Sequence, residues 1–67
     1  MDRMELETAI LEVPAEGVAR LTLNRPERGN AVVPELVRDL MTCFDRIEAS
    51  GGIRVVILTG AGRNFCA

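Results

Sequence analysis

The sequence lacks histidine, lysine, tryptophan and tyrosine, and it contains only two cysteines. Without histidine the chain cannot build the usual histidine-containing zinc sites, and without lysine it cannot form a Schiff base. All eight basic residues are arginines, whose permanently charged guanidinium groups suit carboxylate or phosphate partners. Cys43 and Cys66 show no CxxC spacing and nothing marks the chain as secreted, so we expect two reduced thiols, with a disulfide as the alternative. No metal site is predicted.

Long apolar segments are also absent. The longest apolar run, Val55 to Leu58, is far too short to cross a bilayer, and the acidic N-terminus has no apolar segment typical of a signal peptide. The net charge of -2 argues against a general binder of nucleic acid or acidic membranes. Apolar residues make up 48% and charged residues 27%, which is typical of a globular chain. We therefore predict a cytoplasmic protein with neither nucleic acid nor a membrane as its partner.

Two strands are predicted in the first part of the chain. Residues 5–13 are rich in β-branched and apolar residues, and residues 18–24 alternate between apolar and other side chains. Residues 14–17 carry a turn signal between them, so the two strands are expected to form a hairpin. Pro26 ends the second strand because it cannot donate a hydrogen bond to a ladder. The residues expected on one face of that strand are Ala19, Leu21 and Leu23.

A helix is predicted over residues 34–50, because Pro34 suits the first helical position and Gly51 and Gly52 follow the last one. Apolar residues recur at helical spacing and are expected to form the buried stripe. These are Leu36, Val37, Leu40, Met41, Phe44 and Ile47. The carboxylates on the other side are expected to be solvated, as are those of the first strand. They are Asp39, Asp45, Glu48, Glu5, Glu7 and Glu12.

Residues 53–59 form the third predicted strand, in which four successive apolar residues indicate a strand covered on both faces. The expected order is ββαβ, with the third strand parallel to the second, which places the chain in the α/β class. One helix can cover only one face of a sheet. We therefore expect residues 1–67 to be the N-terminal part of a single larger α/β domain.

The turn that follows the third strand, Thr59-Gly60-Ala61-Gly62-Arg63, has two interpretations besides a plain turn. It resembles the start of a dinucleotide fingerprint, but Asn64 and Cys66 stand where further glycines are needed, and the motif follows the third strand rather than the first. Cys66 could be a nucleophile, but no histidine is present to activate it and its neighbours are apolar. Packing is the favoured interpretation for both Cys66 and Cys43.

Two segments together resemble a known family. Residues 18–31 read V-A-R-L-T-L-N-R-P-E-R-G-N-A, which is similar to the first signature of the enoyl-CoA hydratase/isomerase (crotonase) superfamily. Residues 54–67 read R-V-V-I-L-T-G-A-G-R-N-F-C-A, which resembles the second signature, where the family continues with Gly-x-Asp. The spacing between the segments, with one amphipathic helix, also fits. The resemblance covers nearly the whole chain.

The resemblance implies a crotonase-like ββα spiral fold, of which this chain is the N-terminal ββαβ portion, usually assembled as a trimer or a dimer of trimers. It also implies an acyl-CoA thioester as the ligand, with coenzyme A as part of the substrate and no separate cofactor. A guanidinium suits a CoA phosphate, although a solvated loop arginine is the alternative for Arg28. The implied substrate-binding residues are Arg28, Gly29, Ala31, Cys66 and Ala67.

The same resemblance places the catalytic glutamates and the oxyanion-hole amides beyond Ala67, so no catalytic residue is predicted within this chain. The complete protein is expected to be an enoyl-CoA hydratase, a lyase that adds water to a 2-enoyl-CoA, or an isomerase of fatty acid metabolism. The alternative is a non-catalytic truncated fragment that persists only when packed on a partner chain. We expect the 67 residues alone to show no turnover.

Overall fold

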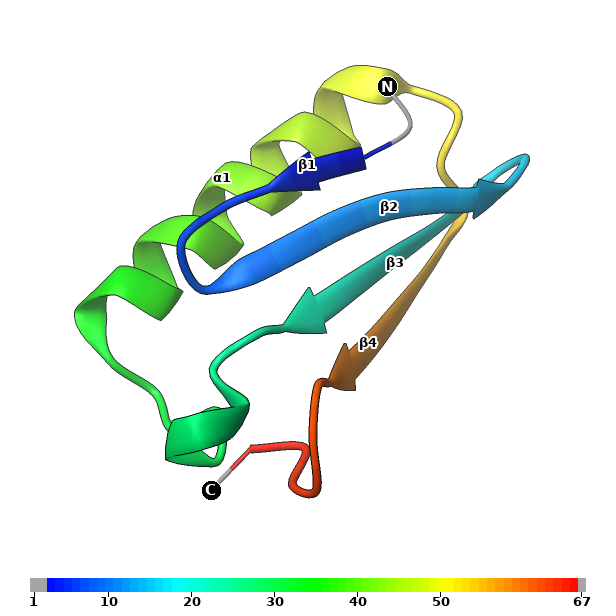
Figure 1. The fold of residues 1–67 in the computed structure, drawn as a ribbon. Coiled ribbons are helices and arrows are strands. Elements are labelled where there is room, and N and C mark those ends of the chain that lie inside the picture. Colours follow the sequence, from blue (N-terminus) through cyan, green and yellow to red (C-terminus); the bar gives the residue numbers. More distant parts are fainter. Residues whose placement is uncertain (1–2, 67) are drawn as a thin grey trace.

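One helix lies across one face of a four-stranded sheet in this computed structural model, which describes residues 3–66 (Figure 1). The strand order in the sheet follows the chain, β1-β2-β3-β4. The elements are β1 (Arg3–Glu5), β2 (Ala9–Ala15), β3 (Val18–Leu23), the 3-10 helix η1 (Pro26–Arg28), α1 (Pro34–Ser50) and β4 (Val55–Gly60). The α/β character and the parallel pairing of the last two strands were both predicted from the sequence and are confirmed.

The predicted hairpin is present, but its first strand is shorter and is preceded by another. β2 and β3 pair antiparallel, with Leu11 opposite Leu21, and the register shifts between Glu12 and Ala15, around Pro14. A bulge accommodates a proline there because the ladder is already interrupted. The predicted single strand over residues 5–13 is wrong: a turn separates β2 from the short β1, which pairs antiparallel with β2.

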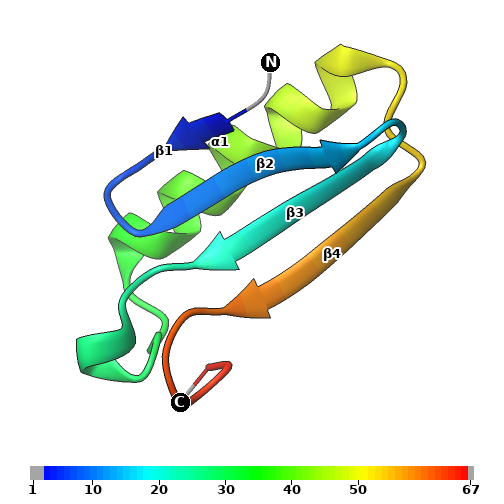
Figure 2. The same ribbon diagram turned by 45° about the vertical axis from the view of Figure 1, so that its right-hand side comes forward.

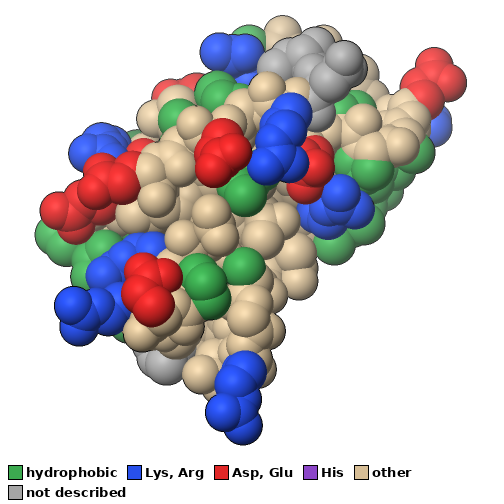
Figure 3. Space-filling view, in the orientation of Figure 1, with side chains coloured by type: hydrophobic (Ala, Val, Ile, Leu, Met, Phe, Trp, Pro, Cys, Tyr) green, Lys and Arg blue, Asp and Glu red, His purple; other side chains and the backbone are tan. Residues whose placement is uncertain are grey.

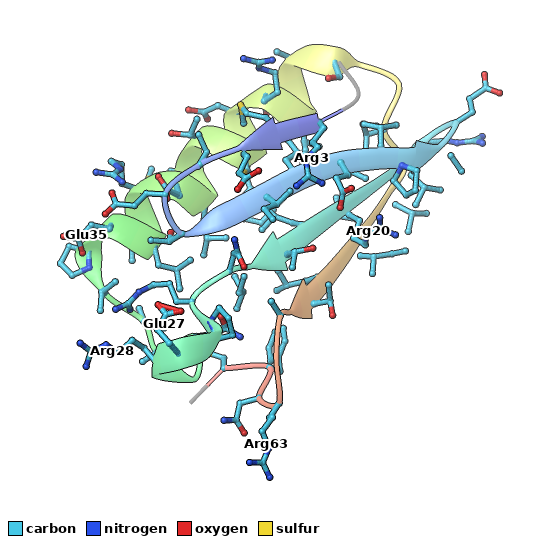
Figure 4. All side chains as sticks on the ribbon, viewed as in Figure 1. Arg3, Arg20, Glu27, Arg28, Glu35 and Arg63 are labelled. Carbon is cyan, nitrogen blue, oxygen red and sulfur yellow. The ribbon has the colours of Figure 1, made fainter. Side chains whose placement is uncertain are left out.

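Charged side chains on the outer face of the sheet pair across the strands. Glu12 of β2 lies opposite Arg3 of β1 and Arg20 of β3, and its carboxylate oxygens lie 3.0 and 3.2 Å from their guanidinium groups. Figure 4 labels Arg3 and Arg20 over this part of the sheet. The expectation that Glu12 is a freely solvated charge is therefore wrong. Opposite charges directly across a ladder stabilise the pairing.

The helix has the predicted bounds. Val33 precedes it in extended conformation without a side-chain cap, Pro34 occupies the first turn, and Gly51 ends it in the left-handed region with φ 75°. Proline and glycine thus mark its start and its end as their backbone preferences require. The described part of the chain contains no helix with the length and apolar character needed to cross a bilayer.

The core lies between α1 and the inner faces of β2 and β3. Its buried apolar residues are Ala9, Leu11, Ala19, Leu21, Leu23, Leu36 and Cys43. The predicted face of β3 is thereby confirmed, and so is the packing role of Cys43. Leu40 and Ile47 lie partly buried against this core.

The predicted helical stripe is confirmed at Leu36, Leu40 and Ile47 and wrong at its other three residues. Val37, Met41 and Phe44 are 46%, 63% and 48% exposed, whereas Asp39, expected in solvent, is only 3% exposed. The buried stripe instead follows positions 36, 39, 40, 43 and 47. The physical reason is a polar partner for the carboxylate: Thr8 donates two hydrogen bonds to Asp39, so burial leaves no unsatisfied charge.

Strand β4 lies at the edge of the sheet, on the side away from α1 (Figure 2). Val56 is opposite Ala19 and Leu58 is opposite Leu21, so both lie on the face that α1 covers over β2 and β3. The four apolar residues of β4 nevertheless remain 39–53% exposed. The single helix does not reach this strand within residues 3–66, and its coverage by a further layer of a larger domain stays a prediction.

Candidate functional site

Two loops meet at one end of the sheet. Strands β3 and β4 are parallel neighbours, so the segments that leave their carboxyl ends lie at the same edge. Loop 25–31 follows β3 and contains η1, and loop 61–66 follows β4. Both lie together at the lower end of the molecule in Figures 1 and 2. The Ala61 amide extends the ladder by donating to the Leu23 carbonyl at 2.8 Å.

The side chain of Asn30 joins the two loops. It is fully buried, and its backbone adopts the left-handed region with φ 58°. Its Oδ1 accepts the Arg25 amide at 2.7 Å within the first loop. Its Nδ2 donates to the carbonyls of Ala61 and Asn64, at 2.9 and 2.8 Å, in the second loop. All the hydrogen-bonding groups of one buried amide are thus used to hold the two loops in one arrangement.

Two glycines allow the loops to approach this closely. A Cβ on Gly60 would meet the backbone of Phe65 and would lie 2.9 Å from Asn30 Nδ2. A Cβ on Gly62 would lie 2.6 Å from Pro26 Cβ, and Gly62 also has φ 83°. Neither position has room for a side chain. Glycine therefore permits the direct contact of loop 61–66 with Pro26 and Asn30.

The predicted site residues of the first loop lie around η1. Arg28 is its last residue, and its side chain is exposed and points away from the molecule in Figure 4. Gly29 ends η1 with φ 63° and donates to the Pro26 carbonyl at 3.1 Å. The Ala31 carbonyl accepts Arg25 Nη1 at 3.2 Å. Loop 25–31 is thus internally ordered and presents one arginine to solvent.

Cys66 reaches the first loop from the second. Its Sγ donates to the Asn30 carbonyl at 3.2 Å, which brings Cys66 next to Ala31. The residue is nevertheless exposed, so of the expected packing in a core or in the wall of a site, the core is wrong for this thiol. Among the predicted site residues, the structure thus brings Gly29, Ala31 and Cys66 together around Asn30. Ala67, the fifth of them, lies outside the described residues.

The charged groups near the loops are mainly cationic side chains that extend outward. Arg28 and Arg63 come from different loops and both point into solvent in Figure 4. The space-filling view shows an isolated cationic side chain at the lower tip of the molecule (Figure 3), where Figure 4 labels Arg63. Residues 3–66 enclose no pocket, and none of their His, Cys, Asp and Glu side chains form a group of three able to hold a metal ion. The loops therefore offer an open surface with exposed arginines rather than a closed cavity.

The groups with perturbed pKa values lie on α1 and not at the loops. Burial acts to raise the pKa of Asp39, but the hydrogen bonds from Thr8 and the contact with Arg38 outweigh it and hold this pKa below its ordinary value. Burial, with a smaller contribution from the Asp39 charge, raises the pKa of the Cys43 thiol. These shifts accompany the packing of the helix on the β1–β2 turn. Asp39 and Cys43 therefore supply no acid or base to the two loops.

The sequence did not lead us to single out Asn30 as the residue that joins the two loops. The signal was present, because an asparagine after a glycine in a loop tolerates the left-handed region and has both a donor and an acceptor. Its carbonyl partners, however, lie 31 and 34 residues away in sequence. Only the parallel pairing of β3 and β4 brings those partners within reach.

Comparisons with known proteins agree on one family. The family model described as enoyl-CoA hydratase/isomerase matches residues 14–67. A probable enoyl-CoA hydratase of Mycobacterium leprae is 42% identical over 65 residues, which is 97% of this chain and 22% of that protein. The 1,2-epoxyphenylacetyl-CoA isomerase of Escherichia coli is 48% identical over 58 residues, or 87% of this chain and 22% of that protein. The chain thus spans about a fifth of the length of these relatives.

Solved structures show the same similarity. An enoyl-CoA hydratase from Mycobacterium marinum superposes with a TM-score of 0.86 at 45% identity, covering 92% of this chain and 31% of that one. A monofunctional enoyl-CoA isomerase from M. smegmatis gives a TM-score of 0.84 at 39% identity, covering 91% of this chain and 29% of that one.

Proposed function

Because the chain belongs to the enoyl-CoA hydratase/isomerase (crotonase) family, we propose that loops 25–31 and 61–66 bind the coenzyme A part of an acyl-CoA thioester. The observation that carries this proposal is the Asn30 bridge, which fixes two strand-end loops side by side before any ligand arrives. Preformed loops lose little conformational entropy on binding.

Each residue proposed for the site has a distinct role. Arg28 is exposed and can turn its guanidinium toward a phosphate of coenzyme A, which a planar fork matches well. Gly29 and Ala31 have little or no side chain, so a ligand can approach their backbone closely. Cys66 contacts the Asn30 carbonyl and forms part of the wall between the loops, and Ala67 is proposed to extend this surface.

The reaction we propose for the complete protein is hydration or isomerisation of a 2-enoyl-CoA, and the support is that one relative is named a probable enoyl-CoA hydratase and one solved structure an enoyl-CoA isomerase. Backbone amides that stabilise the negative charge on a thioester oxygen are the main requirement of such chemistry. We assign no catalytic group to residues 1–67, and coenzyme A enters as part of the substrate. We further propose assembly as a trimer or a dimer of trimers.

Calorimetric titration of the protein with CoA and with NADH tests the ligand class. We expect CoA to bind and NADH not to bind. The variant Arg28→Glu should weaken CoA binding, because it replaces an attraction to the CoA phosphates by a repulsion. The loss should be larger at low than at high ionic strength, because salt screens the interaction between exposed charges. Arg46→Glu, a matched change on the exposed side of α1, should leave the affinity unchanged. Binding of NADH without CoA would revive the dinucleotide interpretation of the Thr59-Gly60 turn.

A second candidate, a non-catalytic chain that persists packed on a partner, is favoured by one observation. The apolar residues of β4 are exposed on both faces, and hydrophobic side chains show on the β4 side of the space-filling view (Figure 3). Such a surface is usually covered by another layer. Size-exclusion chromatography of the 67-residue chain tests this dependence, because a dependent chain aggregates or unfolds when alone, whereas elution as a compact species would contradict it.

A further inference from the structure

We propose that Asn30 is the positioning residue of the acyl-CoA site. It holds loop 61–66 against loop 25–31 and thereby sets the affinity for the nucleotide end of coenzyme A, whose phosphates suit the exposed Arg28 and Arg63 of these loops. This inference rests on the proposed CoA binding and adds to it the residue that makes the two loops act as one site. Asn30 itself is fully buried, so it acts through the loops rather than by touching the ligand.

The connection has three independent parts around this residue. The Asn30 side chain bonds to both loops, its carbonyl accepts the Cys66 thiol, and its amide donates to the Arg25 carbonyl at 2.8 Å. Arg25 in turn donates to the Ala31 carbonyl. A displacement of Asn30 therefore shifts the backbone on both sides of the proposed binding surface at once.

The amide chemistry matters as much as the size of the side chain. Nδ2 lies between two carbonyl oxygens, at 2.9 and 2.8 Å, and only a donor is favourable there. An aspartate of the same shape keeps the acceptor for the Arg25 amide but places a negative oxygen against those two carbonyls. The loops are then pushed apart although the first loop keeps its own hydrogen bond.

The test is to measure by calorimetry the affinities of the wild-type protein and of Asn30→Asp for two ligands. These are CoA and 4′-phosphopantetheine, which lacks the adenosine nucleotide. We expect the variant to lose about tenfold or more in CoA affinity, as the loss of two hydrogen bonds implies, and less than about twofold in phosphopantetheine affinity. A purely structural role would weaken both ligands by the same factor. Asp45→Asn, the reverse exchange at an exposed position on α1, should change neither affinity.

Each alternative outcome has a distinct meaning. If the wild type binds no CoA, the proposed function fails, and with it the site that Asn30 is proposed to position. If the wild type binds CoA and Asn30→Asp binds it equally well, the positioning role alone is overturned. If Asn30→Asp does not fold, Asn30→Gly keeps the left-handed backbone while removing the bridge and should give the same selective loss. Amide hydrogen exchange of the wild type offers a further check, because CoA should slow exchange in both loops together, and protection of only one loop contradicts the proposal.

Discussion

Thr8 donates both its backbone amide and its hydroxyl to the same carboxylate oxygen of Asp39, at 2.8 and 2.7 Å. The contact ties the turn between β1 and β2 to the second turn of α1, across 31 residues of sequence. It is buried, and Arg38 Nε contacts the other carboxylate oxygen at 3.1 Å. This polar contact lies on the side of the helix that faces the sheet, together with the buried Leu36 and Cys43.

Removing this carboxylate should destabilise the protein measurably. Asp39→Ala leaves the Thr8 amide and hydroxyl buried without a partner, so we expect a loss of about 1.5 to 3 kcal/mol in the free energy of unfolding. Thr8→Val removes only the hydroxyl and should lose less. Asp45→Ala, at an exposed position of the same helix, should fall within about 0.5 kcal/mol of wild type. Urea titrations that gave equal losses for Asp39 and Asp45 would contradict the buried contact.

The same carboxylate should make stability depend on acid pH. The pKa of Asp39 in the folded chain lies below its unfolded value, because the Thr8 hydrogen bonds and Arg38 outweigh the opposing effect of burial. Its contribution to stability is therefore fully present above the unfolded pKa of about 4 and is lost as the pH falls through the lower folded pKa. Asp39→Asn should flatten this acid limb. The free energy of unfolding of the wild type and of Asp39→Asn, measured from neutral to acid pH, checks this prediction. Parallel curves for the two proteins would show that Asp39 does not cause the loss of stability in acid.

The local features of the fold could be predicted from the sequence, and the contacts between distant segments could not. The helix bounds follow from Pro34 and Gly51, because both act through their own backbone. The crotonase-like fold class, inferred from the two signatures, is confirmed by the solved relatives. The helical face was wrong because a buried Asp39 needs Thr8, and nothing near Asp39 in sequence announces that partner.

For the candidate site, the position of the two loops could be predicted from the sequence, but the residue that joins them could not. The neighbouring position of the two loops follows from parallel strands joined by one helix, and the structure bears it out. The short β1 was not foreseen because its residues share one apolar pattern with β2, and a turn at residues 6–8 interrupts that pattern without glycine or proline. Asn30 escaped notice because its importance depends on carbonyl groups of the other loop.

Helix substitutions should report the corrected buried face. Leu36 is 1% exposed, so Leu36→Ala should destabilise the protein by about 2 to 5 kcal/mol, as buried large-to-small changes do. Phe44 is 48% exposed on the described surface, and Phe44→Ala should lose clearly less despite the larger side chain. Denaturant unfolding of the two variants makes the comparison. A larger loss at Phe44 would show that another layer of the protein buries that face.

The two thiols should react at very different rates. Cys43 is buried, and burial with the nearby Asp39 charge raises its thiol pKa, so little thiolate is available. Cys66 is exposed between the loops. Iodoacetamide followed by mass spectrometry should label Cys66 first and Cys43 only after denaturant is added. If the loops bind coenzyme A, CoA should slow the labelling of Cys66 in the wild type. Unchanged labelling at saturating CoA would place the ligand elsewhere.

Glycine 60 should be the least replaceable small residue of the site. A Cβ there would collide with the Phe65 carbonyl oxygen, and it would lie 2.8 Å from Phe65 Cα and 2.9 Å from Asn30 Nδ2. Gly60→Ala therefore forces the Asn30 bridge or loop 61–66 to move, and we expect a destabilisation of about 1 to 3 kcal/mol, typical of overpacking.

Gly52 provides the matched control, since a Cβ at Gly52 meets nothing within 4 Å and its backbone lies outside the left-handed region. Gly52→Ala should leave stability unchanged or raise it by up to about 1 kcal/mol, because alanine restricts the unfolded chain. Urea midpoints and CoA affinities of the two variants measured side by side separate the effects. If the loops are held as the structure indicates, Gly60→Ala lowers both quantities and Gly52→Ala lowers neither. Equal behaviour of the two glycines would contradict the prediction, because it would mean that loop 61–66 can move away from Asn30 without loss of stability or of CoA affinity.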